Sequence, residues 1–143
     1  RSVKVYFTYV SLSKIHASSA ANIFSEGIIK APDLDISTSS AGSIEISIDA
    51  GSVMVEASSA GDVVLEGKAR ELEVDVSSAG EVDAYSVDCE IVRASASSAG
   101  SVKISVSKEL TARASSGGSI RYRGSPSKTN TDSSSGGSVK KAN

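Results

Sequence analysis

A short motif built on two serines returns along the chain at an almost fixed interval. SSAG or SSGG stands at six places, preceded by a degenerate SSAA: 18–21, 39–42, 58–61, 77–80, 97–100, 115–118 and 134–137. Successive motifs are offset by 21, 19, 19, 20, 18 and 19 residues. A repeat of this period is the signature of a solenoid or array, in which each structural unit stacks on the next.

Apolar and polar residues alternate on both sides of each motif. Five residues after the first serine the chain always carries Ile or Val: Ile23, Ile44, Val63, Val82, Val102, Ile120 and Val139. Three residues before the motif, all but the last are apolar: Ile15, Ile36, Val55, Val74, Ala94, Ala112 and Thr131. A period of two indicates strands with one buried face. The abundance of serine, glycine and β-branched residues disfavours helices.

Each repeat therefore holds two short strands around the serine motif, with a weaker third segment between them, such as Ile48–Gly51 or Gly67–Arg70. Strands in this number close one coil of an all-β parallel β-helix with coils of about 19 residues. Equivalent residues would then stack about 4.8 Å apart. We expect one domain over 1–143, with an N-terminal strand and cap at 1–17, coils at 18–123 and a polar C-terminal coil or cap at 124–143.

The serine motif is interpreted as a structural corner. Glycine adopts positive φ without steric cost, so we expect the chain to turn at the motif's final glycine. By alternation, the second serine of each motif is expected to point inward and to form a hydrogen-bonded column: Ser19, Ser40, Ser59, Ser78, Ser98, Ser116 and Ser135. A phosphate-binding role is disfavoured, because a P-loop requires GxxxxGK[ST].

The composition limits the interior and its chemistry. Aromatic residues make up 4% of the chain and tryptophan is absent, so the core must consist of small and branched aliphatic side chains. Cys89 is the single cysteine, which excludes an intrachain disulfide and a cysteine-based zinc site. No stretch approaches the roughly 20 apolar residues of a membrane-spanning helix.

Charge is divided unevenly along the chain. Residues 26–90 carry fifteen acidic and three basic side chains, whereas residues 91–143 carry nine basic and two acidic ones. In the stacked arrangement, Lys103, Arg121 and Lys140 form a basic column, which is a hypothetical site for an anionic glycan or lipopolysaccharide. The alternative is a solvated surface with opposite charges on adjacent coils, in the pairs Glu73 with Arg93, Asp83 with Lys103, and Arg113 with Asp132. Nothing aromatic accompanies the basic end in the way that a single-strand binder would need, so we expect no nucleic-acid partner.

Residues for catalysis or metal binding are scarce. His16 is the only histidine and is expected on the outer, solvated surface. Glu56 and Asp75 would be neighbours on adjacent coils, and with Glu73 they offer at most a few ligands for calcium, or a carboxylate pair of the glycosidase type. We expect no catalytic residues, no cofactor and no metal site; the ligand-binding residues stay unknown at this stage.

Three segments carry a resemblance to a known family. They are VKVYFTYVSLSKIHAS at 3–18, the recurrent SSAG followed by x-I/V-x-I/L, and GSIRYRGSPSKTNTDSSSGGSV at 118–139, with the specific pattern Gly-x-Ile-x-Tyr-x-Gly-x-Pro at 118–126. The chain resembles the head GIN domain family, also called putative auto-transporter adhesins. The resemblance implies a right-handed β-helix, export to the periplasm, outer-membrane surface or extracellular space, and no established catalytic residues. It also implies that upstream residues of the full domain are missing from this sequence.

Three functions follow as hypotheses. The first is a non-catalytic envelope or surface module, an adhesin that binds a glycan or an envelope protein through the outer faces of the β-helix. The second is a carbohydrate-active enzyme on the same fold, either a polysaccharide lyase or a hydrolase. The third is a self-assembling scaffold in which the acidic middle of one molecule pairs with the basic end of another. The sequence leaves the oligomeric state open.

Overall fold

The computed structural model describes residues 4–7, 14–17, 22–38, 43–58 and 61–141. Its strands are β1 (Lys4–Phe7), β2 (Lys14–Ala17), β3 (Asn22–Thr38), β4 (Ser43–Ala57), β5 (Asp62–Val76), β6 (Glu81–Ala96), β7 (Ser101–Ala114), β8 (Ser119–Arg123), β9 (Lys128–Ser133) and β10 (Ser138–Lys141). The described residues contain no helix. Within the described residues all strand pairings are parallel, and the sheet runs from β1 and β2 at one end to β9 and β10 at the other.

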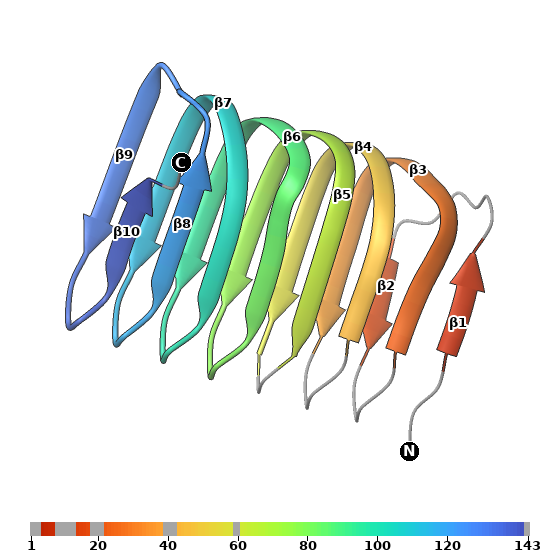
Figure 1. The fold of residues 1–143 in the computed structure, drawn as a ribbon, viewed down its shortest axis with the longest axis horizontal. Coiled ribbons are helices and arrows are strands. Elements are labelled where there is room, and N and C mark those ends of the chain that lie inside the picture. The colour runs from red at the N-terminus through yellow and green to blue at the C-terminus, as the bar shows by residue number, and fades with distance from the viewer. Residues whose placement is uncertain (1–3, 8–13, 18–21, 39–42, 59–60, 142–143) are drawn as a thin grey trace.

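Each of the long strands β3–β7 bends near its middle, so that its two halves lie on opposite sides of the coil. The chain rises along the front in Figure 1, passes over the top and descends along the back while it advances from right to left, which is a right-handed coil. We call the side formed by β1, β8, β10 and the first halves of β3–β7 the first face. The second face consists of β2, β9 and the second halves of β3–β7. The predicted all-β, right-handed parallel β-helix is confirmed.

Equivalent residues of successive repeats lie in register. Val55 pairs with Val74, Val74 with Ala94, and Ala94 with Ala112. On the other face the same is true of Ile44, Val63, Val82, Val102 and Ile120. The spacing of the serine motif therefore predicts the stacking correctly from coil to coil.

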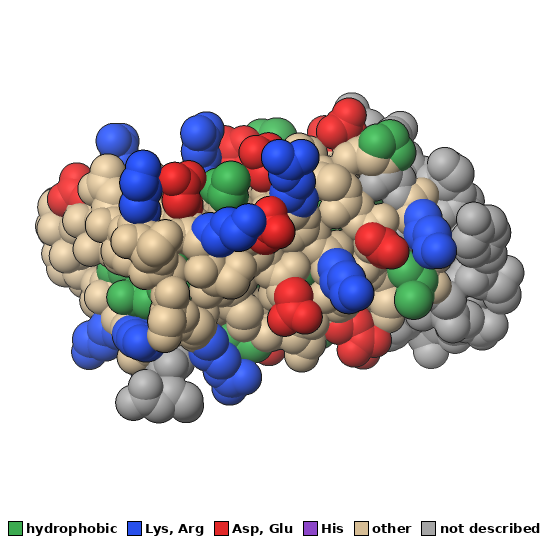
Figure 2. Space-filling view, turned by 90° about the horizontal axis from the view of Figure 1, so that it is seen from above, with side chains coloured by type: hydrophobic (Ala, Val, Ile, Leu, Met, Phe, Trp, Pro, Cys, Tyr) green, Lys and Arg blue, Asp and Glu red, His purple; other side chains and the backbone are tan. Residues whose placement is uncertain are grey.

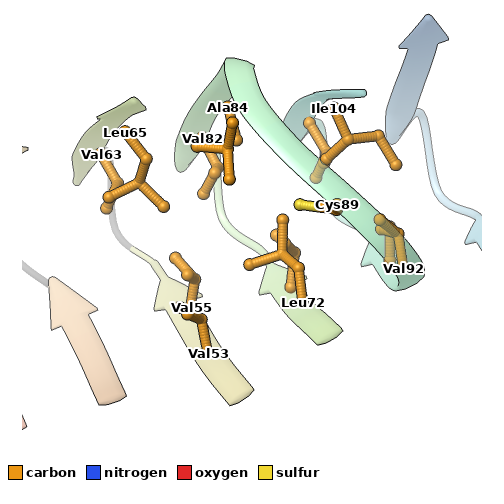
Figure 3. Close-up of a cluster of buried hydrophobic side chains, with 14 of the residues drawn as sticks. Val53, Val55, Val63, Leu65, Leu72, Val82, Ala84, Cys89, Val92 and Ile104 are labelled. Carbon is orange, nitrogen blue, oxygen red and sulfur yellow. The ribbon is translucent and has the colours of Figure 1, made fainter. Parts of the chain in front are cut away.

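The interior between the two faces is filled by aliphatic side chains. Figure 3 shows Val63 and Leu65 of the first face opposite Val53 and Val55 of the second. The fully buried side chains include Ile36, Ile44, Ile48, Leu65, Leu72, Ile104, Leu110 and Ile120. Burial of each such side chain contributes roughly 1.5–3 kcal/mol relative to leaving it in water. Because equivalent layers repeat, a thin core can be extended without large aromatic residues.

The serine motif forms a tight turn, and the prediction that its second serine points inward is wrong. Ser78 and Ala79 both have positive φ, of 52° and 67°, and the amide of Gly80 donates to the carbonyl of Ser77 at 2.9 Å. Two consecutive left-handed residues closed by this bond make a type I′ turn. The turn reverses the alternation, so the second serines face solvent rather than forming an inward column. Of that predicted column, the described members are all exposed: Ser78, Ser98, Ser116 and Ser135. Ser19, Ser40 and Ser59 lie outside the described residues.

The final glycine of the motif also differs from expectation. Its φ is not positive at Gly80, Gly100 or Gly118. Glycine is required there for room, because a Cβ on Gly118 would lie 2.3 Å from the carbonyl oxygen of Ala96 in the coil below. The corners are thus packed backbone against backbone. They are also bonded to one another, as the amide of Ala79 donates to the carbonyl of Ser98 at 3.1 Å.

The C-terminal end of the rod is polar. β9 pairs with the second half of β7, and β10 pairs with β8, so the chain completes another turn after Pro126. The aliphatic file of the second face ends there in Thr129, Thr131 and Ser133, all exposed. Polar edge residues discourage the last strand from adding a strand of another molecule.

Candidate functional site

Three basic side chains line up on the first face at the C-terminal end of the rod. Lys103 of β7 is in register with Arg121 of β8, and Arg121 with Lys140 of β10. We call these three residues the basic ladder. Figure 2 shows Lys and Arg side chains gathered at this end of the molecule, whereas acidic and basic side chains mix over its middle. The stacking predicted for the basic column is therefore confirmed.

A serine file runs beside the basic ladder, two residues earlier in each strand. Ser101, Ser119 and Ser138 are in register and half-buried. A hollow of about 290 Å³ between the files is lined by Glu81, Ser101, Val102, Lys103, Ser119 and Arg121. This hollow combines hydroxyl groups with two positive charges and one negative charge, that of Glu81, so its net charge is positive and suits an anionic, hydroxyl-rich ligand.

A further cation is fixed next to the basic ladder. The guanidinium carbon of Arg123 lies 4.0 Å from the centre of the Tyr85 ring, two coils away. Between them, the Ser105 hydroxyl donates to the Tyr85 carbonyl at 2.6 Å. The cation–π contact restrains Arg123 and holds its positive charge near the first face.

The second face carries a groove of different character. It has a volume of about 370 Å³, and its outward lining is formed by Asp33, Asp35, Ser52, Met54, Glu71, Glu73, Ile91 and Arg93. Met54 is 38% exposed, and Ile91 is half-buried. Sequence reasoning missed this groove, although two apolar residues at outward positions among carboxylates were a usable signal.

The opposite-charge pairs expected across the coils are in register but are not close ion pairs. Glu73 aligns with Arg93, Asp83 with Lys103, and Arg113 with Asp132. In the described part of the chain, nitrogen and oxygen atoms approach within 4 Å in two other pairs, Lys108 with Glu90 at 3.6 Å and Lys128 with Glu109 at 3.7 Å. Exposed pairs of this kind are worth up to about 1 kcal/mol each.

The carboxylates considered for calcium or glycosidase chemistry do not converge. Glu56 and Asp75 are neighbours in register, both exposed on the second face. Among the described residues, no group of three His, Cys, Asp or Glu side chains is arranged to hold a metal ion. The backbone of His16 lies in β2 beside Ser37, and its side chain is outside what the structure describes.

Cys89 is a free, buried thiol that belongs to the aliphatic core, where Figure 3 draws it among the buried side chains. Burial raises the pKa of this thiol from 9.0 to about 12, and the neighbouring carboxylate of Asp88 adds to the increase. The folded chain keeps the thiol protonated at pH values where the unfolded chain ionises it. A neutral buried thiol is a packing group and a poor nucleophile.

Stability should accordingly decline in alkali through Cys89. Between pH 9 and pH 12 the unfolded state loses the thiol proton and the folded state keeps it, so this residue alone lowers the free energy of unfolding by about 1.4 kcal/mol per pH unit. Urea unfolding of the natural chain and of Cys89→Ala, measured at pH 8, 10 and 11, checks this. The variant should lose less stability with rising pH; parallel declines would contradict the assignment.

Comparisons with known proteins agree with this architecture. The family described as "putative auto-transporter adhesin, head GIN domain" matches residues 1–126, and the chain belongs to that family. A search of curated proteins gave no match. In the described residues, no helix has the length and apolar character needed to cross a membrane.

Two solved structures share the fold. One is a "putative adhesin" from Bacteroides fragilis, with a TM-score of 0.84 and 23% identity over 92% of this chain. The other is a "putative lipid binding protein" from Parabacteroides distasonis, with a TM-score of 0.83 and 20% identity over 99% of this chain. The chain spans 61% and 58% of the lengths of those two proteins. At this level of identity the comparison shows the fold alone.

Proposed function

We propose that the chain is a non-catalytic, exported binding module of the bacterial envelope, which holds a surface glycan on an outer face of its β-helix. The observation that carries the proposal is that the two sides of each strand differ, the inward side being apolar and buried and the outward side polar and exposed. Inward side chains fill the interior, whereas outward polar side chains repeat in register and line open grooves. A repetitive polar surface suits a repetitive polar ligand.

Membership of a family described as adhesins supports a binding role. The related structure described as lipid-binding does not lead us to a lipid ligand, because the aliphatic interior of the described coils is occupied by the chain's own side chains. A carbohydrate-active enzyme is the rival hypothesis. Hydrolases of that class place two carboxylates on either side of the scissile bond of a bound sugar, whereas Glu56 and Asp75 are both exposed on the outer surface of the second face.

A glycan array probed with the full chain tests the proposal. We expect retention of one class of glycan, with binding that weakens as salt is added, because the surface groups concerned are charged. Mass spectrometry of the bound glycan after incubation should find it intact. Failure to retain any glycan would refute the binding proposal, and release of shortened products would replace it with the enzyme hypothesis.

A further inference from the structure

The basic ladder has a fixed period and a fixed direction. Lys103, Arg121 and Lys140 occupy one position in three successive parallel strands, so their Cα atoms repeat about every 4.8 Å along the rod. One sugar residue advances a linear 1,4-linked glycan by a similar distance. Successive sugars are rotated about the glycan axis, but lysine and arginine side chains are long and flexible, so a chain with one negative group per sugar can meet one cation per coil.

The basic ladder also has a defined end on the side of β6. Asp83 of β6 occupies the next position in the same file, directly below Lys103, and Glu81 stands beside Ser101. The charge thus changes sign between β6 and β7. A polyanion lying along the file is attracted over three coils and repelled at the fourth.

Hydroxyl groups beside the basic ladder are available to a ligand. Within the described residues, the side chains of Ser101, Ser119 and Ser138 make no hydrogen bond to protein. Each stands two residues before a cation and is half-buried. Each cation is thus flanked by a hydroxyl that can donate to, or accept from, a sugar hydroxyl or carboxylate.

We propose that the basic ladder binds a linear anionic glycan with one negative group per sugar residue, lying parallel to the rod axis and spanning three coils. This rests on the proposed function and assigns its ligand class and its site. One exposed ion pair contributes little. Three such pairs on one ligand act together, because the first contact raises the effective concentration of the others.

Nucleic acid is the rival polyanion. Each strand of a duplex carries one phosphate per 3.4 Å of helix axis, which does not match the period of the basic ladder. Proteins that bind single strands stack the bases on aromatic side chains. Along the ladder and the serine file the residues are lysine, arginine and serine.

Oligogalacturonates of one to six residues carry one carboxylate per sugar and serve as the probe, with the full chain, low salt and a chelator to exclude calcium bridging. Binding measured by calorimetry should strengthen at least tenfold from one residue to three and then level off. Methyl-esterified oligomers of the same length keep the sugars without the charges and should not bind.

Three substitutions sharpen the test. Arg121→Glu, at the centre of the ladder, should weaken trimer binding at least tenfold. Arg70→Glu makes the same charge change at an exposed position of β5 outside the ladder and should leave binding unchanged. Asp83→Lys adds a fourth cation, so the length at which affinity levels off should move from three residues to four.

The possible outcomes separate the two proposals. Trimer binding unaffected by Arg121→Glu, or affinity independent of oligomer length, would overturn the ladder assignment. So would equal binding of single-stranded oligothymidylate. If the natural chain does not bind oligogalacturonates but retains another class of glycan on the array, with binding that weakens as salt is added, the ladder assignment fails and the proposed function stands. If it retains no glycan of any kind, both fail.

Discussion

Gly118→Ala is expected to lower the free energy of unfolding by about 3 kcal/mol, whereas Gly117→Ala should cost about 1 kcal/mol or less. The added Cβ at position 118 meets the carbonyl carbon and oxygen of Ala96 at 2.5 and 2.3 Å. These are backbone atoms of a paired coil and cannot rotate away. Relief requires the coils to separate, which strains the intercoil hydrogen bonds that Ser115 donates to Ala96 and that Ser119 donates to Gly100.

Gly117 is a matched control in the same corner. Its φ is +80°, and the nearest atom to an added Cβ is 4.0 Å away. The corresponding residues of the two preceding coils are already alanines, Ala79 and Ala99, with φ of 67° and 68°. Urea unfolding followed by circular dichroism compares the two variants. If both lose the same stability, the close approach of the coils is not the reason why glycine recurs at the last position of the motif.

Val74→Asp should destabilise the fold by about 4 kcal/mol at neutral pH, because it places an unpaired carboxylate in an aliphatic interior. Val74 is 1% exposed and lies between Val55 and Ala94 in its file. Burial raises the pKa of a carboxyl group, so the new aspartate should be protonated near pH 5. Because protonation removes the charge, part of the lost free energy of unfolding should be recovered at that pH.

Asp75→Val is the control for this substitution. Asp75 is the next residue of β5 and points to solvent. Substitution there should change stability by no more than about 0.5 kcal/mol. Guanidinium unfolding monitored by two probes measures both variants and shows whether the coils still unfold together. If Val74→Asp left the free energy of unfolding unchanged and Asp75→Val lowered it, the side chain of residue 75 and not that of residue 74 would point inward.

The stacking was predictable because two periods in the sequence agree. The alternation of apolar residues gives the buried side of each strand, and the serine spacing gives the partner on the next coil. Together they place Val55 over Val74 and Lys103 beside Arg121, as the structure shows. The basic ladder thus followed from the sequence once the register was known.

Two details did not follow from those periods. Alternation holds only while the backbone stays extended, so it could not predict that Ser78 and Ala79 are both left-handed or that the second serines face outward. The interior position of Cys89 was also missed. Pairing between β6 and β7 shifts between Ala84 and Cys89, so counting from the motif loses its accuracy within that segment.

Because each coil contacts mainly the coils next to it, the length of this molecule is set by the number of its coils. Inserting or deleting one 19-residue unit would shift everything beyond it by a single strand spacing and leave every other contact as it was. A family built in this way can lengthen or shorten its members by whole coils, without changing the coils that remain.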